Sequence, residues 1–457
     1  MRPDSGIFRA YDIRGDASTQ LTEDVMAQIG RAFAGILWEK TSHPQVCVAH
    51  DGRESSPRLA GALVESLRCA GVDVIFLGLG STPFLYWSEY QLEVSGALMV
   101  TGSHNPPKDN GLKMTLGRKP FFGEAIQDLL RRIHRPPPSQ DMGRLETRSL
   151  LSAYGQSFFS SPISWGSRPL KVVWDPGHGA VGAVLRQVTE ALPIDSVILH
   201  EDVNGTFPAR SPDPTKTGAL SVLKQTVLET GADLGIAFDG DGDRLVCMDD
   251  QGSVWSGDEL LVFFAEKLHQ TFPDLLVCAD IKISPFLCSR LESQGIQVSV
   301  GRTGHVYLKD SMKALSSLLG GEVSGHFFFR DAHAGFDDGL YASLRLIQFL
   351  SHQNAPLSSW YQTLPKRYKS GEQRVPCSDQ QKPFVMEALY QAFSQRGEKI
   401  CTLDGMKVIC DDAWWLIRPS HTEQMLVIRW ESETIERFLD LKKIIFDELR
   451  ELNTVIE

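Results

Sequence analysis

Short apolar runs alternate with segments of helical length through roughly the first three quarters of the chain. Such alternation is typical of βαβ units, because a strand of a parallel sheet is buried on both faces and is apolar throughout. We therefore expect an α/β fold. The expected strands are 46–50, 72–77, 96–101, 171–175, 196–200, 234–239, 245–249, 275–280, 296–300 and 322–329. The expected helices are 56–70, 257–270 and 337–351.

The chain's last quarter has a different pattern. Strand-like runs at 371–377, 414–419 and 425–430 precede one expected helix at 433–452, which indicates an α+β domain. With 457 residues, the chain exceeds what one hydrophobic core usually supports, so we expect two to four domains.

Charge and composition exclude several classes of protein. The net charge of −11 argues against a protein that coats nucleic acid. No stretch approaches the ~18 apolar residues of a membrane span, and charged residues crowd the first twenty positions. The eight cysteines form neither a CxxC pair nor a zinc-type spacing. We expect a soluble, cytoplasmic monomer without nucleic-acid or membrane partners.

Three aspartates, Asp239, Asp241 and Asp243, alternate with glycines where an expected strand ends. Carboxylate oxygens are ligands that Mg²⁺ prefers, and glycines let a short loop turn them inward. A calcium EF-hand is excluded, because its sixth position would be Arg244 instead of glycine and its twelfth Asp250 instead of glutamate. A solvated acidic turn is the remaining alternative to a metal site.

Ser103 follows a glycine in TGSHN, also at a strand end. His104 and Lys113 are close enough in sequence to supply protons or positive charge. The motif is not the G-x-S-x-G elbow of serine hydrolases, and an ordinary turn serine is the alternative. A phosphate of about −1.5 to −2 on Ser103 would leave the aspartates, metal and Arg244 with net negative charge, which Arg14 and Lys113 could offset.

Two further loops carry groups suited to a sugar phosphate. RPSHTE, 418–423, combines a guanidinium with two hydroxyls, as a phosphate requires. Its Ser420 and Glu423 also have capping-box spacing, although the sequence that follows alternates like a strand. In GEVSGH, Glu322, Ser324 and His326 would share one face of an extended strand and could bind sugar hydroxyls. A solvated edge strand explains GEVSGH equally well.

Five segments, FRAYDIRG, TGSHNPP, DGDGDR, GEVSGH and RPSHT, together resemble the α-D-phosphohexomutase family, most closely its bacterial phosphomannomutase/phosphoglucomutase branch. Their order and spacing extend the resemblance over almost the whole chain. It implies three consecutive mixed α/β domains and a C-terminal α+β domain around a central cleft. We expect these domains at 1–147 (phosphoserine loop), 148–253 (metal loop), 254–366 (sugar loop) and 367–457 (phosphate loop).

The resemblance also implies an isomerase that interconverts mannose or glucose 1-phosphate and 6-phosphate through a hexose 1,6-bisphosphate, which also acts as activator. Ser103 would be the phosphoserine, and Asp239, Asp241 and Asp243 would bind Mg²⁺ together with it. The transfer site would contain Arg14, His104, Lys113 and Arg244. The implied substrate-binding residues are Tyr11, Lys282, His305, Glu322, Ser324, His326, Arg418, Ser420, His421 and Thr422.

The chain departs from the family pattern at His421, where many relatives carry asparagine, and at Arg302, where relatives carry lysine. A histidine in the phosphate loop puts the pH dependence of that loop in doubt. GEVSGH is similar to the GEMSGH of enzymes that act on both mannose and glucose phosphates, so we expect dual activity. A glucosamine-phosphate mutase and a non-catalytic sugar-phosphate-binding protein are the alternatives.

Overall fold

The computed structural model describes residues 3–135, 140–160, 164–420 and 423–452. The chain divides into two compact units. The first unit combines Met1–Leu260 with Ser324–Ser359, and the second combines Leu261–Val323 with Trp360–Glu457. The chain therefore leaves the first unit, returns to it once and leaves it again.

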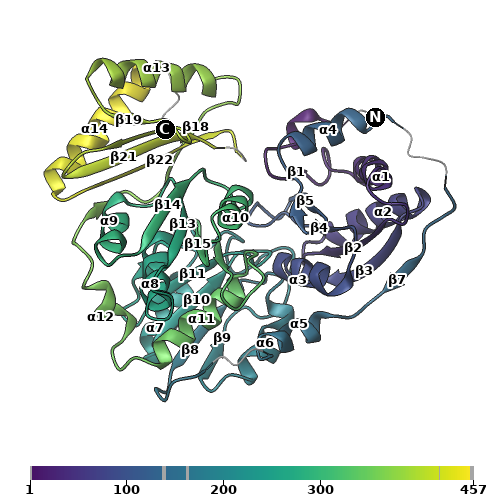
Figure 1. Cartoon of the computed structure of the whole chain (residues 1–457), viewed down its shortest axis with the longest axis horizontal. Helices are drawn as coiled ribbons and strands as arrows, with labels where there is room; N and C mark the ends of the chain where they lie inside the picture. Colours follow the sequence, from purple (N-terminus) through teal and green to yellow (C-terminus); the bar gives the residue numbers. More distant parts are fainter. Residues whose placement is uncertain (1–2, 136–139, 161–163, 421–422, 453–457) are drawn as a thin grey trace. The chain divides into compact units, whose positions relative to one another are not determined.

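The first sheet of the first unit has the strand order β1-β5-β4-β2-β3-β7 (Figure 1). β6 pairs with β5. β2, β3, β4 and β7 are parallel, whereas β1 and β5 are antiparallel to their neighbours. The strands are β1 (Ile13–Asp16), β2 (Gln45–His50), β3 (Asp73–Leu79), β4 (Gly96–Val100), β5 (Asp109–Leu116), β6 (Lys119–Pro120) and β7 (Leu145–Thr147). Its helices are α1 (Glu23–Trp38), α2 (Ser56–Cys69), α3 (Thr82–Leu92) and α4 (Glu124–Arg132), after the short helix η1 (Ser5–Ile7).

The hydrophobic core of this sheet explains why its helices form. α1 begins where the Thr22 hydroxyl accepts a hydrogen bond from the Val25 amide. Ile29, Phe33 and Leu37 recur every four residues on its buried face. Each such side chain contributes about 1.5–3 kcal/mol when fully buried. α1 thus packs against this core with one apolar face.

The second sheet of the first unit has the order β12-β11-β10-β8-β9. β8, β9 and β10 are parallel, and β11 is antiparallel to β10. Its strands are β8 (Lys171–Asp175), β9 (Asp195–Ile198), β10 (Leu234–Phe238), β11 (Leu245–Asp249) and β12 (Val254–Trp255). The helices that accompany it in sequence are α5 (Leu151–Ser157), α6 (Gly182–Glu190) and α7 (Ser221–Thr230). β16 (Phe327–Phe329) and α11 (Gly339–Ser351) also belong to the first unit.

The second unit contains one parallel and one antiparallel arrangement of strands. β13 (Leu276–Asp280) lies between β14 (Gln297–Gly301) and β15 (Leu319–Gly321), and all three are parallel. The helices of this part are α8 (Gly257–His269), which begins in the first unit, α9 (Pro285–Ser293) and α10 (His305–Ala314). α12 (Leu357–Tyr361) lies at the second border between the units.

The C-terminal sheet has the order β17-β22-β21-β20-β19, with β18 also paired to β22, and is antiparallel throughout. Its elements are β17 (Tyr368–Lys369), β18 (Gln373–Pro376), α13 (Lys382–Gln395), β19 (Ile400–Cys401), β20 (Met406–Ile409), β21 (Ala413–Pro419), β22 (Met425–Ser432) and α14 (Ile435–Glu451). The expectation of one helix here was incomplete, because α13 was missed. Val385, Leu389 and Phe393 form the buried face of α13. Phe384 and Tyr390 are also apolar but are exposed, so the helical spacing of apolar residues is not evident in the sequence.

One expected strand is wrong. Residues 322–326 form a turn between β15 and β16 instead of continuing a strand through 322–329. Gly325 adopts φ +94°, a conformation that side-chain-bearing residues rarely adopt, and a Cβ there would lie 2.5 Å from the Leu245 carbonyl oxygen. Glu322, Ser324 and His326 therefore do not share one face of a strand.

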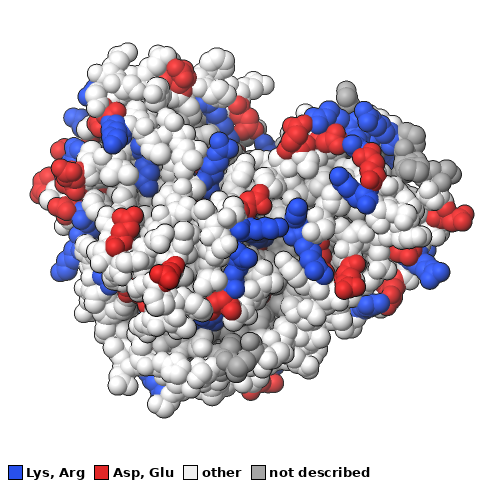
Figure 2. Space-filling model, in the orientation of Figure 1, with Lys and Arg blue, Asp and Glu red and all other residues white. Residues whose placement is uncertain are grey.

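The charged side chains are interspersed over the face shown in Figure 2, with Lys and Arg beside Asp and Glu. The net charge of −11 is thus not gathered into one acidic patch on that face. Among the described residues, no helix is both long and apolar enough to cross a membrane.

Candidate active site

Ser103 lies in the loop that joins β4 to β5, in the first unit. Its φ of +46° is unusual for a residue with a side chain and has to be imposed by its surroundings. The fully buried Arg53 does this: its guanidinium donates hydrogen bonds of 2.6–2.9 Å to four carbonyl oxygens of the loop, those of Ser103, Asn105, Pro106 and Asp109. Asp51 in turn holds Arg53 by an ion pair of 3.1 Å. The loop is thus built around one arginine.

The Ser103 hydroxyl points at the aspartate loop. Its Oγ donates a hydrogen bond of 3.2 Å to Asp239 Oδ2 and lies 3.1 Å from His104 Nδ1. Gly240 permits this approach, because a Cβ there would lie 2.5 Å from the Ser103 carbonyl oxygen. The structure therefore brings together the serine and the aspartate loop, as the resemblance implies.

Asp239, Asp241 and Asp243 follow β10 in one tight loop. All three carboxylates are buried, and each offers an oxygen within 4.8 Å of the others. Gly242 has φ +76° and lies so close to Val181 that a Cβ would approach its methyl group to 2.2 Å. Glycine is therefore required for this loop to fold its carboxylates together.

The three buried carboxylates of this cluster shift one another's pKa values. Burial, and then the charges of Asp243 and Asp241, raise the pKa of Asp239 well above its ordinary value. Burial opposes ionisation of Asp243 as well, but Lys113 and His326 outweigh it and hold its pKa well below the ordinary value. Three buried carboxylates repel one another strongly unless cations lie among them.

The protein supplies positive charge to this cluster. Lys113 Nζ lies 2.7 Å from Asp241 Oδ2 and also contacts Asp243. Arg244 Nε lies 3.7 Å from Asp239 Oδ2. Among the described residues, Asp241 Oδ1 is buried without a hydrogen-bond partner. A buried carboxylate oxygen without a donor fits a site that a divalent cation completes.

His326 adjoins the triad as a group able to exchange a proton. Its Nε2 lies 3.2 Å from Asp243 Oδ1 and 3.3 Å from Arg244 Nε, and its Nδ1 lies 3.2 Å from Ser324 Oγ. Asp337 forms a second cluster of possible ligands with Asp243 and His326. The sequence indicated His326 and Ser324 but not Asp337, which precedes α11 by two residues.

Arg14 and Tyr11 belong to the same unit. Arg14 lies on β1, where its Nε donates to Asp12 Oδ2 at 2.7 Å and its guanidinium also binds the Gly102 carbonyl oxygen. This contact places the positive charge of Arg14 beside the residue before Ser103. Tyr11 is half-buried in the turn before β1.

The other predicted substrate-binding residues that the structure describes belong to the second unit, and several of them lie near the carboxyl end of β13. Lys282 is buried, with Nζ 2.7 Å from Glu372 Oε1 and 3.5 Å from Asp280 Oδ2. Burial raises the pKa of Asp280 to about 6, although Lys282 opposes the shift. Glu322 Oε1 accepts a 2.6 Å hydrogen bond from the Gly304 amide, one residue before His305. Glu322 is therefore hydrogen-bonded to the loop between β14 and α10.

Arg418 joins this group through a carboxylate that the sequence did not indicate. Asp404 Oδ2 accepts hydrogen bonds from Arg418 Nε at 3.2 Å and from the Thr303 amide at 3.0 Å. Thr303 Oγ1 also donates to Asp280 Oδ2 at 3.1 Å. Arg418 on β21 and the loop before α10 are thus fixed to one another.

Ser420 follows β21 directly. Its Oγ accepts a hydrogen bond of 3.1 Å from the Glu423 amide, and its carbonyl oxygen accepts one of 2.6 Å from Lys382. The S-x-x-E spacing thus gives a hydrogen bond from a backbone amide to the Ser420 side chain, between β21 and β22, and does not cap a helix. His421 and Thr422 lie outside the described residues.

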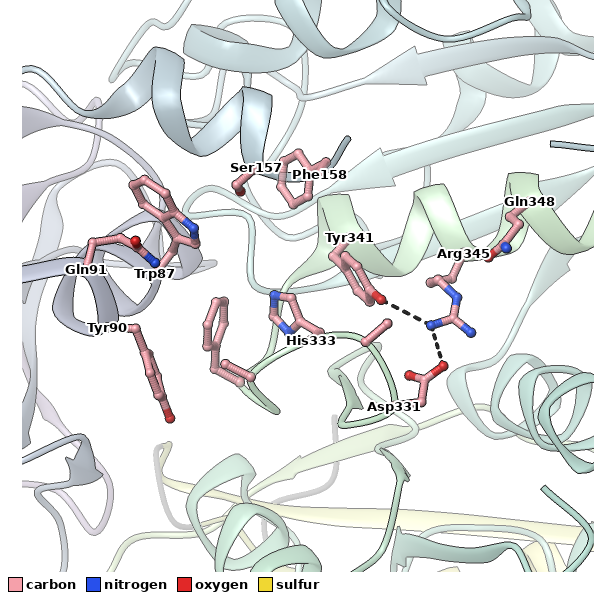
Figure 3. A pocket seen from close by; sticks show the side chains of 13 residues that line it. Trp87, Tyr90, Gln91, Ser157, Phe158, Asp331, His333, Tyr341, Arg345 and Gln348 are labelled. Carbon is pink, nitrogen blue, oxygen red and sulfur yellow. Dashed lines mark hydrogen bonds and ion pairs between the residues drawn. The ribbon is translucent and has the colours of Figure 1, made fainter. Parts of the chain in front are cut away.

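A cavity of about 500 Å³ lies elsewhere in the first unit (Figure 3). Aromatic side chains line it, with the ion pair of Arg345 and Asp331 at one end. Burial lowers the pKa of His333 in its wall to about 3, which keeps that imidazole neutral. Its lining contains none of the residues indicated by the sequence. The lining residues are Trp87, Tyr90, Gln91, Ser157, Phe158, Asp331, Ala332, His333, Ala334, Phe336, Tyr341, Arg345 and Gln348.

Four family models match the chain in succession. They are phosphoglucomutase/phosphomannomutase alpha/beta/alpha domain I at 5–136, domain II at 153–252, domain III at 256–368 and the C-terminal domain at 372–448. A phosphomannomutase/phosphoglucomutase of Pseudomonas syringae is 36% identical over 450 residues, 98% of this chain and 96% of that protein.

Solved structures agree with this match. A phosphoglucomutase/phosphomannomutase family protein of Burkholderia thailandensis superposes with a TM-score of 0.90 at 32% identity, covering 100% of this chain and 99% of its own. An Aspergillus fumigatus N-acetylphosphoglucosamine mutase in complex with GlcNAc-6P and magnesium has the same fold. It superposes with a TM-score of 0.59 at 14% identity, over 98% of this chain and 96% of its own.

Proposed function

The chain belongs to the phosphoglucomutase/phosphomannomutase family and interconverts hexose phosphates, and we propose that it moves the phosphoryl group through Ser103. The observation that carries this proposal is the 3.2 Å hydrogen bond from Ser103 Oγ to Asp239 within a buried aspartate triad. A hydroxyl held there would carry its phosphate directly beside a cation site and beside Lys113. Phosphoryl transfer depends mainly on such positioning and on charge.

Asp239, Asp241 and Asp243 would hold Mg²⁺ together with the phosphate of Ser103. Their oxygen donors, their burial and the Asp241 oxygen without a partner support this assignment. A fungal structural neighbour was solved with magnesium. Bound there, the cation would offset the negative charge of the phosphoryl group during transfer.

The neighbouring residues have distinct roles in the proposal. Lys113, Arg14 and Arg244 supply positive charge around the phosphoryl group. His104 Nδ1, 3.1 Å from Ser103 Oγ, is positioned to accept or donate the hydroxyl proton. Each transfer makes one P–O bond and breaks another, so the accepting hydroxyl loses a proton and the departing oxygen gains one.

The substrate residues would hold the sugar at two places. Glu322 and Ser324 would bind hydroxyls, and Arg418, Ser420, His421 and Thr422 would bind the phosphate that is not transferred. Tyr11, Lys282, His305 and His326 would complete the binding site. The fixed position of Arg418 on Asp404 supports a preformed phosphate site.

The reaction requires the sugar to bind in both orientations. Ser103 phosphate would pass to the hexose phosphate and give a hexose 1,6-bisphosphate, which returns its other phosphate to the serine. Mannose and glucose differ at C2 only, so contacts to shared hydroxyls and a distal phosphate would accept both. We propose that small-molecule hexose phosphates, with the bisphosphate as activator, are the ligands of this site.

We propose four domains, at 1–147, 148–253, 254–366 and 367–457. The four matched family models support this division, since the first two borders fall in gaps between matched spans and the third lies two residues before the end of the third span. Each domain would contribute one loop to the reaction.

The test combines a coupled assay with intact mass. Mannose 1-phosphate, glucose 1-phosphate and glucosamine 1-phosphate would each be supplied with Mg²⁺ and a catalytic amount of the matching bisphosphate. We expect turnover of the mannose and glucose compounds, an 80 Da adduct on the purified protein, and loss of both in Ser103→Ala. Retained activity in Ser103→Ala would refute the phosphoserine. A protein that binds these sugars without turnover would be the non-catalytic alternative, and preference for the glucosamine compound would change the assigned sugar.

A further inference from the structure

We infer that Thr82 is a positioning residue for the cation ligand Asp241, and that its hydroxyl decides which carboxylate oxygen is left for the cation. The inference rests on the proposed function, since it assumes that the aspartate triad binds a divalent cation. Thr82 is not one of the family motif residues considered above. It is indicated by its contacts alone.

Thr82 meets Asp241 at two points. Its Oγ1 donates a hydrogen bond of 2.5 Å to Asp241 Oδ2, and its backbone amide donates one of 2.9 Å to the Asp241 carbonyl oxygen. Both side chains are fully buried. The pair therefore fixes the side chain and the backbone of Asp241 together.

The start of α3 holds Thr82 in place. Ser81 caps the helix by accepting a hydrogen bond of 3.2 Å from the Phe84 amide, and Pro83 occupies the first turn. Thr82 thus stands at the helix N-terminus, where the helix dipole favours a negative charge. The capped first turn of α3 therefore fixes the position from which the Thr82 hydroxyl reaches Asp241.

The two carboxylate oxygens of Asp241 differ in their hydrogen-bond partners. Oδ2 accepts from Thr82 and also from Lys113 at 2.7 Å. Oδ1 is buried and has no hydrogen-bond partner among the described residues. Rotation of the carboxylate away from this orientation would break both bonds, so Thr82 and Lys113 together hold one oxygen and leave the other available to a cation.

Thr82 and Lys113 differ in how they respond to a cation. Lys113 carries a positive charge and is repelled by an arriving divalent ion. The Thr82 hydroxyl is neutral and has a single proton to donate, so its bond to Oδ2 remains compatible with a cation at Oδ1. Partners of this kind around metal ligands typically change metal affinity 10- to 100-fold, an order-of-magnitude range, when they are removed.

The test measures metal binding directly, with Mn²⁺ as the probe and electron paramagnetic resonance of the unbound ion as the readout. Thr82→Val removes the donor and keeps the shape of the side chain, whereas Thr82→Ser keeps the donor. We expect Thr82→Val to weaken Mn²⁺ binding at least ~10-fold and Thr82→Ser to stay within about threefold of the parent protein. Should Thr82→Val fail to fold, Thr82→Ala carries the same expectation.

Thr189→Val is the matched control. Thr189 is also buried, but its hydroxyl bonds to the Arg186 carbonyl oxygen of its own helix. Mn²⁺ affinity should be unchanged in this variant. Parental affinity in Thr82→Val, or equal weakening in Thr82→Ser, would overturn the inference. Failure of the parent protein to bind Mn²⁺ would instead refute the cation site of the proposed function.

Discussion

Arg53 Nη2 donates a hydrogen bond of 2.6 Å to the carbonyl oxygen of Ser103, and the two residues are both buried. Three further carbonyl oxygens of the same loop bind this guanidinium. The unusual backbone of the proposed phosphoserine is therefore maintained by one side chain from another strand end.

Arg53→Lys should reduce kcat and destabilise the fold. Lysine cannot reach four carbonyl oxygens with a planar fork, so the loop loses its fixed geometry. We expect kcat to fall about 100-fold, the effect that a displacement of the reacting group by roughly 1 Å typically has. The free energy of unfolding should fall by about 2–4 kcal/mol. Steady-state kinetics and urea denaturation measure the two effects. Arg131→Lys, at an exposed ion pair with Glu124, is the control and should change neither. An unaltered kcat in Arg53→Lys would contradict the role of Arg53.

Gly240→Ala should impair catalysis by pushing two loops apart. A Cβ at Gly240 would lie 2.5 Å from the Ser103 carbonyl oxygen, which is backbone and cannot move aside easily. We expect kcat to fall roughly 10- to 100-fold. Gly61→Ala on α2 is the matched control, because nothing lies within 4 Å of its Cβ. That variant should keep its activity and gain about 0.5–1 kcal/mol of stability. Equal kinetics for both alanine variants would argue against close contact of the loops.

Asp404→Asn should weaken binding of the sugar phosphate without abolishing chemistry. An asparagine lacks the charge that fixes Arg418 and can accept less strongly from the Thr303 amide. We expect KM to rise about tenfold, from the loss of 1–2 kcal/mol, while kcat changes little. Initial rates over a range of glucose 1-phosphate concentrations measure both constants. Asp412→Asn, whose carboxylate lies 3.5 Å from Arg437, is the control. A selective fall in kcat would contradict this prediction.

Asp338 should make stability depend on pH. Burial raises the pKa of Asp338 to about 7, although hydrogen bonds from the Tyr341 amide and the Tyr154 hydroxyl oppose the shift. Asp337 and His333, the latter 3.7 Å away, are the other titratable groups nearby. Between about pH 4 and 7 the folded state binds a proton that the unfolded state has lost, so stability falls as pH rises.

The comparison with Asp338→Asn isolates this effect from other titrations. An asparagine stays neutral and can still accept from the Tyr341 amide. Relative to that variant, the parent protein should gain about 2–3 kcal/mol of unfolding free energy between pH 8 and pH 5. Urea denaturation at both pH values measures the difference. A difference that does not vary with pH would show that Asp338 is ionised throughout.

The sequence predicted most strands of the three α/β sheets, and the most apolar of these strands are buried on both faces. All five residues of β10 and all five of β11 are buried, so their apolar runs are continuous. α13 and the turn at 322–326 were not predicted. The period of α13 is interrupted by exposed aromatic residues, and the alternation in GEVSGH resembles a strand until Gly325 reverses the chain.

Ser103 and Asp239 each follow a strand, a position that indicated their loops as places for chemistry, and the resemblance implied that the two residues are close. Arg53 follows β2 in the same way and could have been found by the same rule. Thr82 and Asp404 could not, because each acts through a contact with a residue more than ten positions away. A single threonine or aspartate carries no local pattern that reveals such a partner.

The return of the chain to the first unit limits how the protein can be divided. The Gly339 amide, at the start of α11, donates a hydrogen bond of 3.1 Å to the Gly242 carbonyl oxygen, inside the aspartate loop. A fragment that ended at residue 260 would contain Ser103 and all three aspartates but not the helix that supports their loop. Ser103 and the three aspartates are encoded in one gene fragment of that length, but the helix that supports their loop is encoded outside it.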